Sequence, residues 1–133
     1  WWLEDDDMDF SKKNKYIWTS MIRQPEFVTK EIFDFACDEL KKKKPHIDVS
    51  KARLEVFDEG LCVQCMHIGP FDQEHVIIEK IDKFILENNL INDIGSVYEK
   101  GSVRGHHEIY LSDPRRVNKA KMKTVIRHPV RRE

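Results

Sequence analysis

Residues 61–88 read LCVQCMHIGPFDQEHVIIEKIDKFILEN, and this stretch decides the fold class. Its first eight residues are mostly apolar and predict a strand, which Gly69-Pro70 ends. From 73 to 88 the apolar side chains recur at helical spacing, which predicts an amphipathic helix. They are Ile77, Ile78, Ile81, Phe84 and Ile85. Asp72 is the predicted N-cap, because its carboxylate can accept a hydrogen bond from a first-turn amide. A strand followed directly by a helix with one apolar face indicates a layered protein of helices on a sheet.

The flanking segments predict four further strands and a second helix. The strands are expected at 16–23, 53–57, 106–112 and 123–128, the last closed by Pro129. The helix is expected from the cap Thr29 to about Lys44, where four lysines suit the negative end of the helix dipole. A turn at 58–60 is expected to join the strands on either side of it as a hairpin, and 92–105 is expected to be a loop or ragged hairpin. This order predicts an α+β domain, with both helices on one face of an antiparallel sheet.

Length and composition limit the class of protein. The 133 residues fit one domain spanning 1–133, and the formal net charge of -1 argues against a nucleic-acid partner. No apolar run approaches the roughly 20 residues that span a bilayer, and no signal-peptide pattern is visible, so we expect no membrane partner and a cytoplasmic protein. The acidic start and the basic end of the chain are interpreted as solvated patches.

Three segments carry a family resemblance. They are HIGPFDQE at 67–74, HEIYLSDPRR at 107–116 and KMKTVIR at 121–127. Together they resemble GyrI-like small-molecule-binding domains, and the second resembles the signature of a branch similar to cyclopropanoid cyclopropyl hydrolases. MIRQP at 21–25 and the opening Trp1-Trp2 also fit.

The resemblance implies a tandem pair of strand-helix-strand-strand units with a ligand cleft between the halves. Measured against that pattern, the first unit of this sequence lacks its opening strand and helix. We therefore expect the first strand to be exposed, or to be completed by residues absent here or by a second copy in a homodimer, because an open apolar edge favours association.

Two glutamates are the candidate catalytic residues. Glu108 lies mid-strand between apolar neighbours and on the same strand face as Tyr110, where a carboxylate is costly without a partner or a task. The resemblance places a cleft glutamate at this position, so we expect Glu108 on the sheet face opposite the helices. The alternative is a structural glutamate paired with an arginine. Glu74, at the first turn of the second helix, is the second candidate; the alternative is simple complementarity to the helix dipole.

Aromatic, histidine and methionine side chains are the candidate ligand contacts. We expect a flat pocket walled by aromatic rings, which stack on planar ligands, with histidines that hydrogen-bond the ligand or orient a carboxylate. The candidates are Trp2, Trp18, Phe71, Tyr110, His67, His106 and Met21. The alternative for each is ordinary packing or a structural hydrogen bond.

Cys62 and Cys65 form a CxxC motif that invites a metal or redox interpretation. Because both lie in a predicted strand, their thiols are expected on opposite faces and cannot readily share an ion. We expect no metal and no organic cofactor.

Two functions from different classes remain open. The branch resemblance implies hydrolysis of the cyclopropane in duocarmycin- or yatakemycin-type alkylating compounds, with Glu108 and Glu74 activating water. The alternative is a non-catalytic module that sequesters or senses drugs, in which the same glutamate is a counter-ion for a cationic aromatic ligand.

Overall fold

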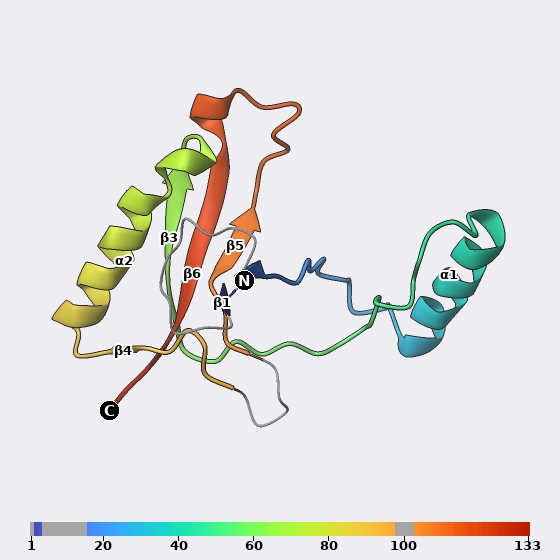
Figure 1. The fold of residues 1–133 in the computed structure, drawn as a ribbon, viewed down its shortest axis with the longest axis horizontal. Coiled ribbons are helices and arrows are strands. Elements are labelled where there is room, and N and C mark those ends of the chain that lie inside the picture. The colour runs from blue at the N-terminus through green and yellow to red at the C-terminus, as the bar shows by residue number, and fades with distance from the viewer. Residues whose placement is uncertain (1, 4–15, 98–102) are drawn as a thin grey trace. The chain divides into compact units, whose positions relative to one another are not determined.

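The computed structural model describes residues 2–3, 16–97 and 103–133. The chain divides into two compact units, one formed within residues 1–19 and 59–133 and the other by residues 20–58. Each unit is described by itself, and the single domain over 1–133 stays a prediction. The larger unit contains a sheet and a helix, and the smaller contains one helix, so the α+β class is confirmed (Figure 1).

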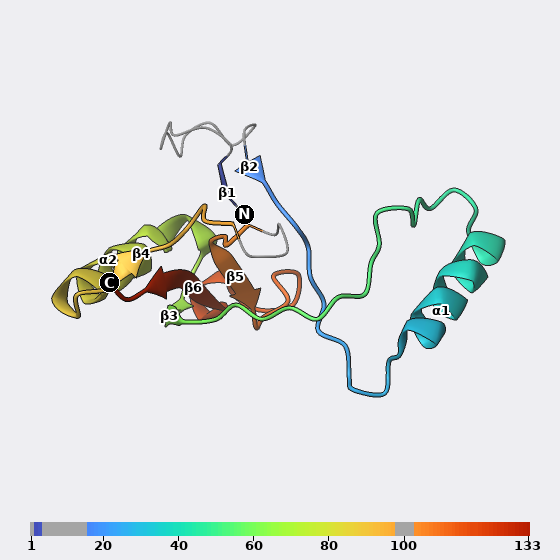
Figure 2. The same cartoon turned by 90° about the horizontal axis from the view of Figure 1, so that it is seen from below.

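Strand β6 (Lys123–Arg131) is the centre of a four-stranded antiparallel sheet. It pairs along one side with β3 (Cys62–Ile68), and on its other side with β5 (His107–Tyr110) and β4 (Ile91–Asn92). Figure 2 shows β3, β6 and β5 running side by side. A separate two-stranded pairing joins β1 (Trp2–Leu3) to β2 (Tyr16–Ile17).

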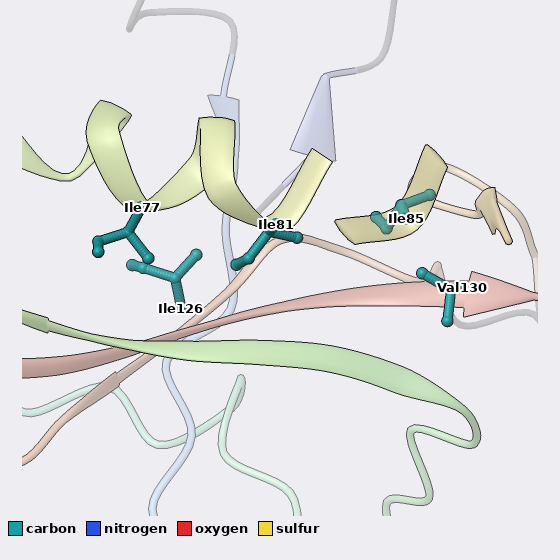
Figure 3. Packing of buried hydrophobic residues seen from close by; sticks show 5 residues of the cluster. All are labelled: Ile77, Ile81, Ile85, Ile126 and Val130. Atoms are coloured by element: carbon teal, nitrogen blue, oxygen red, sulfur yellow. The ribbon is translucent and has the colours of Figure 1, made fainter. Parts of the chain in front are cut away.

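Helix α2 (His75–Glu87) covers one face of this sheet. Its stripe of Ile77, Ile81 and Ile85 packs against Ile126 and Val130 of β6 (Figure 3). Val63 and Cys65 of β3 border the same cluster. Each buried aliphatic side chain contributes about 1.5–3 kcal/mol, so this small cluster is the main stabilising contact between helix and sheet.

The start of α2 differs from the prediction. A 3-10 turn, η2 (Phe71–Gln73), precedes the helix, and Glu74 rather than Asp72 is the N-cap. The amides of Gln73 and Glu74 donate to the carbonyls of Pro70 and Phe71, at 3.1 and 3.2 Å. The Asp72 cap is wrong because these backbone carbonyls satisfy the amides that a side-chain cap would otherwise take.

Two predicted strands are wrong or too long. Residues 53–57 adopt no strand, so the hairpin around 58–60 does not form, and the long neighbour of β3 is β6 instead. Seven positions of β3 pair with β6, which lies far from it in the sequence. The strand expected at 16–23 is limited to β2.

The last strand continues through Pro129 instead of ending before it. Proline has no amide proton, but its neighbours keep the ladder intact. The Val130 amide donates to the Leu61 carbonyl, and the Asp93 amide donates to the Pro129 carbonyl, both at 3.0 Å. These two bonds carry the strand to Arg131.

The smaller unit contains helix α1 (Lys30–Lys43). The Thr29 hydroxyl accepts from the Ile32 amide, and three lysines occupy the last turn, as predicted. Among the described residues, no helix has the length and apolar character needed to cross a bilayer.

Candidate functional site

The register between β5 and β6 determines which face of the sheet carries Glu108. Glu108 lies directly across the β5–β6 ladder from Ile126, whose side chain packs against α2. Residues directly opposite each other in an antiparallel pair project to the same face. Glu108 therefore lies on the face that carries α2, and its predicted place on the opposite face is wrong. The alternation of β5 grouped Glu108 with its neighbours but did not say which face they occupy.

Two side chains hold the Glu108 carboxylate. The Tyr110 hydroxyl donates to Oε2, and Nε2 of His106 lies 3.2 Å from Oε1. His106 and Tyr110 are each two residues away from Glu108 along the strand, so the three side chains project to the same face of the sheet. The side chain of Glu108 is only partly exposed. The Tyr110 hydroxyl is a hydrogen-bond donor to this carboxylate, and the His106 ring lies at ion-pair distance from its other oxygen.

Glu74 brings a second carboxyl into this site from the start of α2. It is 9% exposed, and its Oε1 has no hydrogen-bond partner among the described residues. The pKa of Glu74 is raised to about 7, chiefly by burial and also by the charge of Glu108, whereas His67 and Thr124 act in the opposite direction. One of two neighbouring carboxyls is thus held partly protonated at neutral pH, as in sites that perform acid–base chemistry.

Thr124 is a site residue that the sequence did not reveal. It lies in β6 between His67 of β3 and Tyr110 of β5, directly across from each, and it is fully buried. Its Oγ1 makes no hydrogen bond of normal geometry among the described residues, although it lies close enough to the Glu74 carboxyl to lower the pKa of that group. The sequence offered one indication of this role: Thr124 lies two residues before Ile126, so in a strand the two side chains project to the same face of the sheet. A strand threonine is so common, however, that nothing marked this one.

His67 serves the turn beside the site. Its buried ring lies with Nε2 2.9 Å from the Pro70 carbonyl, and Gly69 between them has a φ of 140°. A side chain at position 69 would be strained at this φ and would approach the His67 ring to 3.3 Å. The alternative of a structural histidine therefore describes His67 well, although its charge still acts on Glu74.

Phe71 and Tyr110 form the aromatic part of the site. Their rings meet edge to face, with centroids 5.5 Å apart, and both remain largely exposed. Burial and the hydrogen bond to Glu108 raise the pKa of Tyr110, so its hydroxyl stays protonated at neutral pH. Phe71 also lines a concavity of about 740 Å³, together with residues 68–73 and part of 114–122. Glu74, Glu108 and Tyr110 do not line this concavity, and Phe71 is the residue of the ring pair that does.

The remaining candidates are Trp18, Met21 and Trp2. Trp18 is exposed in the larger unit, and Met21 is exposed in the smaller unit. The Trp2 side chain lies outside the described part of the structure.

An ion-pair network occupies the opposite face of the sheet. Glu59 accepts from the guanidinium of Arg127, and its Oε1 lies 2.8 Å from Nδ1 of His107. Arg127 also donates to Gln64 at 2.9 Å. The glutamate–arginine pairing that was the structural alternative for Glu108 is thus made by Glu59.

The predicted orientation of Cys62 and Cys65 toward opposite faces of the sheet is confirmed. Cys62 lies across from Pro129 and Cys65 across from Ile126, so the two thiols project to opposite faces. Within residues 2–3, 16–97 and 103–133, no group of three or more histidine, cysteine or acidic side chains is arranged to hold a metal ion.

The comparisons with known proteins agree with this fold. The family model described as GyrI-like small molecule binding domain matches residues 2–131. No curated protein matches the chain.

Three crystal structures from Listeria innocua resemble it. An uncharacterized conserved protein is 44% identical with a TM-score of 0.87, covering 98% of this chain and 60% of that one. Two described as hydrolases are 45% and 42% identical, with TM-scores of 0.70 and 0.77. They cover 82% and 98% of this chain and 52% and 60% of their own. The chain thus spans about half to three fifths of the length of these relatives.

Proposed function

Because this chain belongs to the GyrI-like family of small-molecule-binding domains, we propose that it binds a flat, mostly apolar molecule beside Glu74 and Glu108 and hydrolyses it. The proposed substrate is the cyclopropane of duocarmycin- or yatakemycin-type alkylating compounds. One observation carries the proposal: two carboxyls share the α2 face of the sheet, and the pKa of Glu74 is raised to about 7 while Glu108 accepts from Tyr110.

The reaction needs little from the protein, because the strained ring is already electrophilic. The oxygen of a water molecule bonds to a cyclopropane carbon as the strained carbon–carbon bond breaks. The electron pair of that bond moves into the conjugated ring and onto its carbonyl oxygen, which is protonated from solvent. The ionised carboxylate accepts the proton that water loses. A positioned general base typically contributes about 10²–10⁴-fold.

The two carboxyls take different parts in this scheme. Glu108 is the general base, since Tyr110 and His106 orient its oxygens. Glu74, partly neutral near pH 7, holds the water by a hydrogen bond. Its Oε1 and the Thr124 hydroxyl are buried polar atoms of the kind that bind water or a polar ligand group. The aromatic body of the substrate stacks on Phe71 and Tyr110.

Two similar structures described as hydrolases support the hydrolytic part of the proposal. The alternative is a non-catalytic drug-binding module. The exposed ring pair of Phe71 and Tyr110 beside Glu108 favours this alternative for cationic aromatic ligands, since such a site supplies both stacking and a counter-ion.

Product analysis separates the two functions. The full chain is incubated with a spirocyclopropane-bearing compound in ¹⁸O-labelled water, and the molecular mass of the product is measured by mass spectrometry. The proposal predicts enzyme-dependent appearance of a ring-opened alcohol that carries one ¹⁸O. Saturable binding without any excess of this product over a protein-free control would favour the binding module.

A further inference from the structure

Behind Glu108 lies a pair of buried histidines, and the reaction scheme gives a role to His106 but none to His128. His106 and His128 are 4% and 3% exposed. Nδ1 of His106 lies 2.8 Å from Nε2 of His128, and the ring centroids are 4.9 Å apart. The other nitrogen of His106, Nε2, is the one that faces Glu108 at 3.2 Å. Glu108, His106 and His128 thus form a continuous row from the carboxylate into the core.

The positions of the protons in this row follow from the chemistry of the atoms that meet. Nε2 of His106 lies 3.2 Å from a carboxylate oxygen, and this contact favours the tautomer with a hydrogen on Nε2, because two lone pairs would repel there. In the neutral ring Nδ1 of His106 is then an acceptor, and His128 must donate to it from Nε2. His128 is left with a bare Nδ1, which has no hydrogen-bond partner among the described residues. A buried acceptor without a partner is less costly than a buried N–H without one, so this assignment is consistent along the whole row.

His128 suits the role of a fixed donor. The pKa of His128 is lowered to about 4, chiefly by burial and also by the charge of His106. His128 is therefore neutral at neutral pH, and as a neutral ring it can donate from only one nitrogen at a time. Ile126 and Val130, on either side of it in β6, pack under α2 and hold the strand in place.

We propose that His128 is a positioning residue of the site, which fixes the tautomer of His106 so that His106 Nε2–H faces and orients the Glu108 carboxylate. The inference rests on the proposed function for its catalytic consequence, but not for the tautomer. An orienting partner behind a reactive group is a recurring arrangement, because it keeps the group in its productive rotamer and protonation state. Tyr110 fixes one oxygen of Glu108, and the histidine row fixes the other.

The tautomer is tested by ¹⁵N NMR of the histidine rings in the full chain at neutral pH. The proposal expects His106 with its hydrogen on Nε2 in the wild type, and a mixture of tautomers in His128→Leu, which fills the space but removes the donor. His128→Gln retains an N–H donor and is expected to restore the wild-type spectrum in part. A hydrogen on Nδ1 of His106 in the wild type would overturn the proposal. This NMR measurement requires neither a variant nor enzymatic activity.

Kinetics test the consequence for Glu108. His128→Leu is expected to lower kcat for ring opening about ten-fold with KM nearly unchanged, because the dyad orients the base and does not touch the substrate. His128→Gln is expected to recover part of that loss. His75→Leu, an exposed histidine at the start of α2, is the matched control and is expected to retain wild-type kcat. A folded His128→Leu with wild-type kcat would overturn the positioning role. A wild type that binds but does not turn over would refute the proposed hydrolysis and leave the NMR test of the dyad intact.

Discussion

Glu108 and Ile126 face each other across the β5–β6 ladder, so the carboxylate of the site and the centre of the core lie on one face of the same sheet. Helix α2 contacts β3, β4 and β6, and its first residues bring Glu74 to this face. The proposed site therefore lies at the margin of the core, where burial is sufficient to raise the pKa of a carboxyl. Mutations that test the site thus also report on stability, and the two effects have to be measured separately.

The raised pKa of Glu74 predicts a pH-dependent stability of a specific sign. The folded pKa of about 7 lies above the usual pKa of 4.5 for a glutamate, so the folded protein retains a proton that the unfolded chain has lost. The contribution of Glu74 to stability is therefore present below pH 4.5 and is lost as the pH rises through 7. We expect Glu74→Gln to gain about 2–3 kcal/mol relative to wild type between pH 4.5 and 8, measured by urea unfolding. Glu87→Gln at the other end of α2 is the control, and an equal pH response in Glu74→Gln and wild type would contradict the assignment.

His128 predicts the opposite trend on the acid side. Its folded pKa of about 4 lies below the usual histidine pKa of 6.5, so the unfolded chain binds the proton first as the pH falls. The stability that His128 contributes is present above pH 6.5 and is lost as the pH falls through 4. We expect the difference in unfolding free energy between wild type and His128→Gln to shrink by about 2–3 kcal/mol over this range. His75→Gln should show no such trend; a difference that stays constant from pH 7 to pH 4 would argue against a neutral buried ring.

The core cluster predicts a large cost for truncating its centre. Ile81 is 1% exposed and packs against β6, so Ile81→Ala should lower the unfolding free energy by about 2–5 kcal/mol. Leu86 on the same helix is 77% exposed, and Leu86→Ala should change it by no more than about 0.5 kcal/mol. Urea midpoints of the two variants measure this contrast, and similar losses in both would mean that α2 packs through a different face.

The hydrogen bond from Tyr110 to Glu108 predicts that removing the hydroxyl lowers the turnover rate without weakening ligand binding. Tyr110→Phe keeps the ring against Phe71 but removes the hydroxyl that donates to Glu108. We expect turnover to fall about ten-fold, in line with the loss of one hydrogen bond to a charged group, while a neutral aromatic ligand binds as before. Phe71→Leu is the complementary variant and should weaken that binding by about 0.5–1.5 kcal/mol. Titration with a fluorescent planar ligand and steady-state kinetics measure the two effects.

The parts of the fold that depend on neighbouring residues were predictable. The spacing of Ile77, Ile81 and Ile85 predicted α2 and its buried face, and Thr29 predicted the cap of α1. The pairing of β3 with β6 was not predictable from local patterns, because the two strands are about sixty residues apart and many strand pairings satisfy the same alternation. The wrong hairpin at 53–60 and the wrong face for Glu108 both follow from this nonlocal choice.

Within the site, the sequence likewise predicted only those relationships that depend on residues close together in the chain. Glu108 and Tyr110 share a face by simple alternation, and the structure places Phe71 beside Tyr110. Thr124 and His128 carry no signal of their own, since their roles depend on which strands lie beside them and on the depth at which they are buried. Met21 belongs to the other unit, a division that no local pattern marked.

The central claim, that the carboxylate of Glu108 performs chemistry, is tested most directly by Glu108→Gln. The change keeps the shape and polarity of the side chain but removes the base, so ring opening of a spirocyclopropane substrate should fall by about 10²-fold or more. Binding of a neutral planar ligand should remain within about two-fold, because stacking on Phe71 and Tyr110 does not need the charge. Glu87→Gln, an exposed glutamate at the end of α2, is the matched control and should retain wild-type kinetics. Ring opening by Glu108→Gln at the wild-type rate would contradict the account, whatever happens to binding.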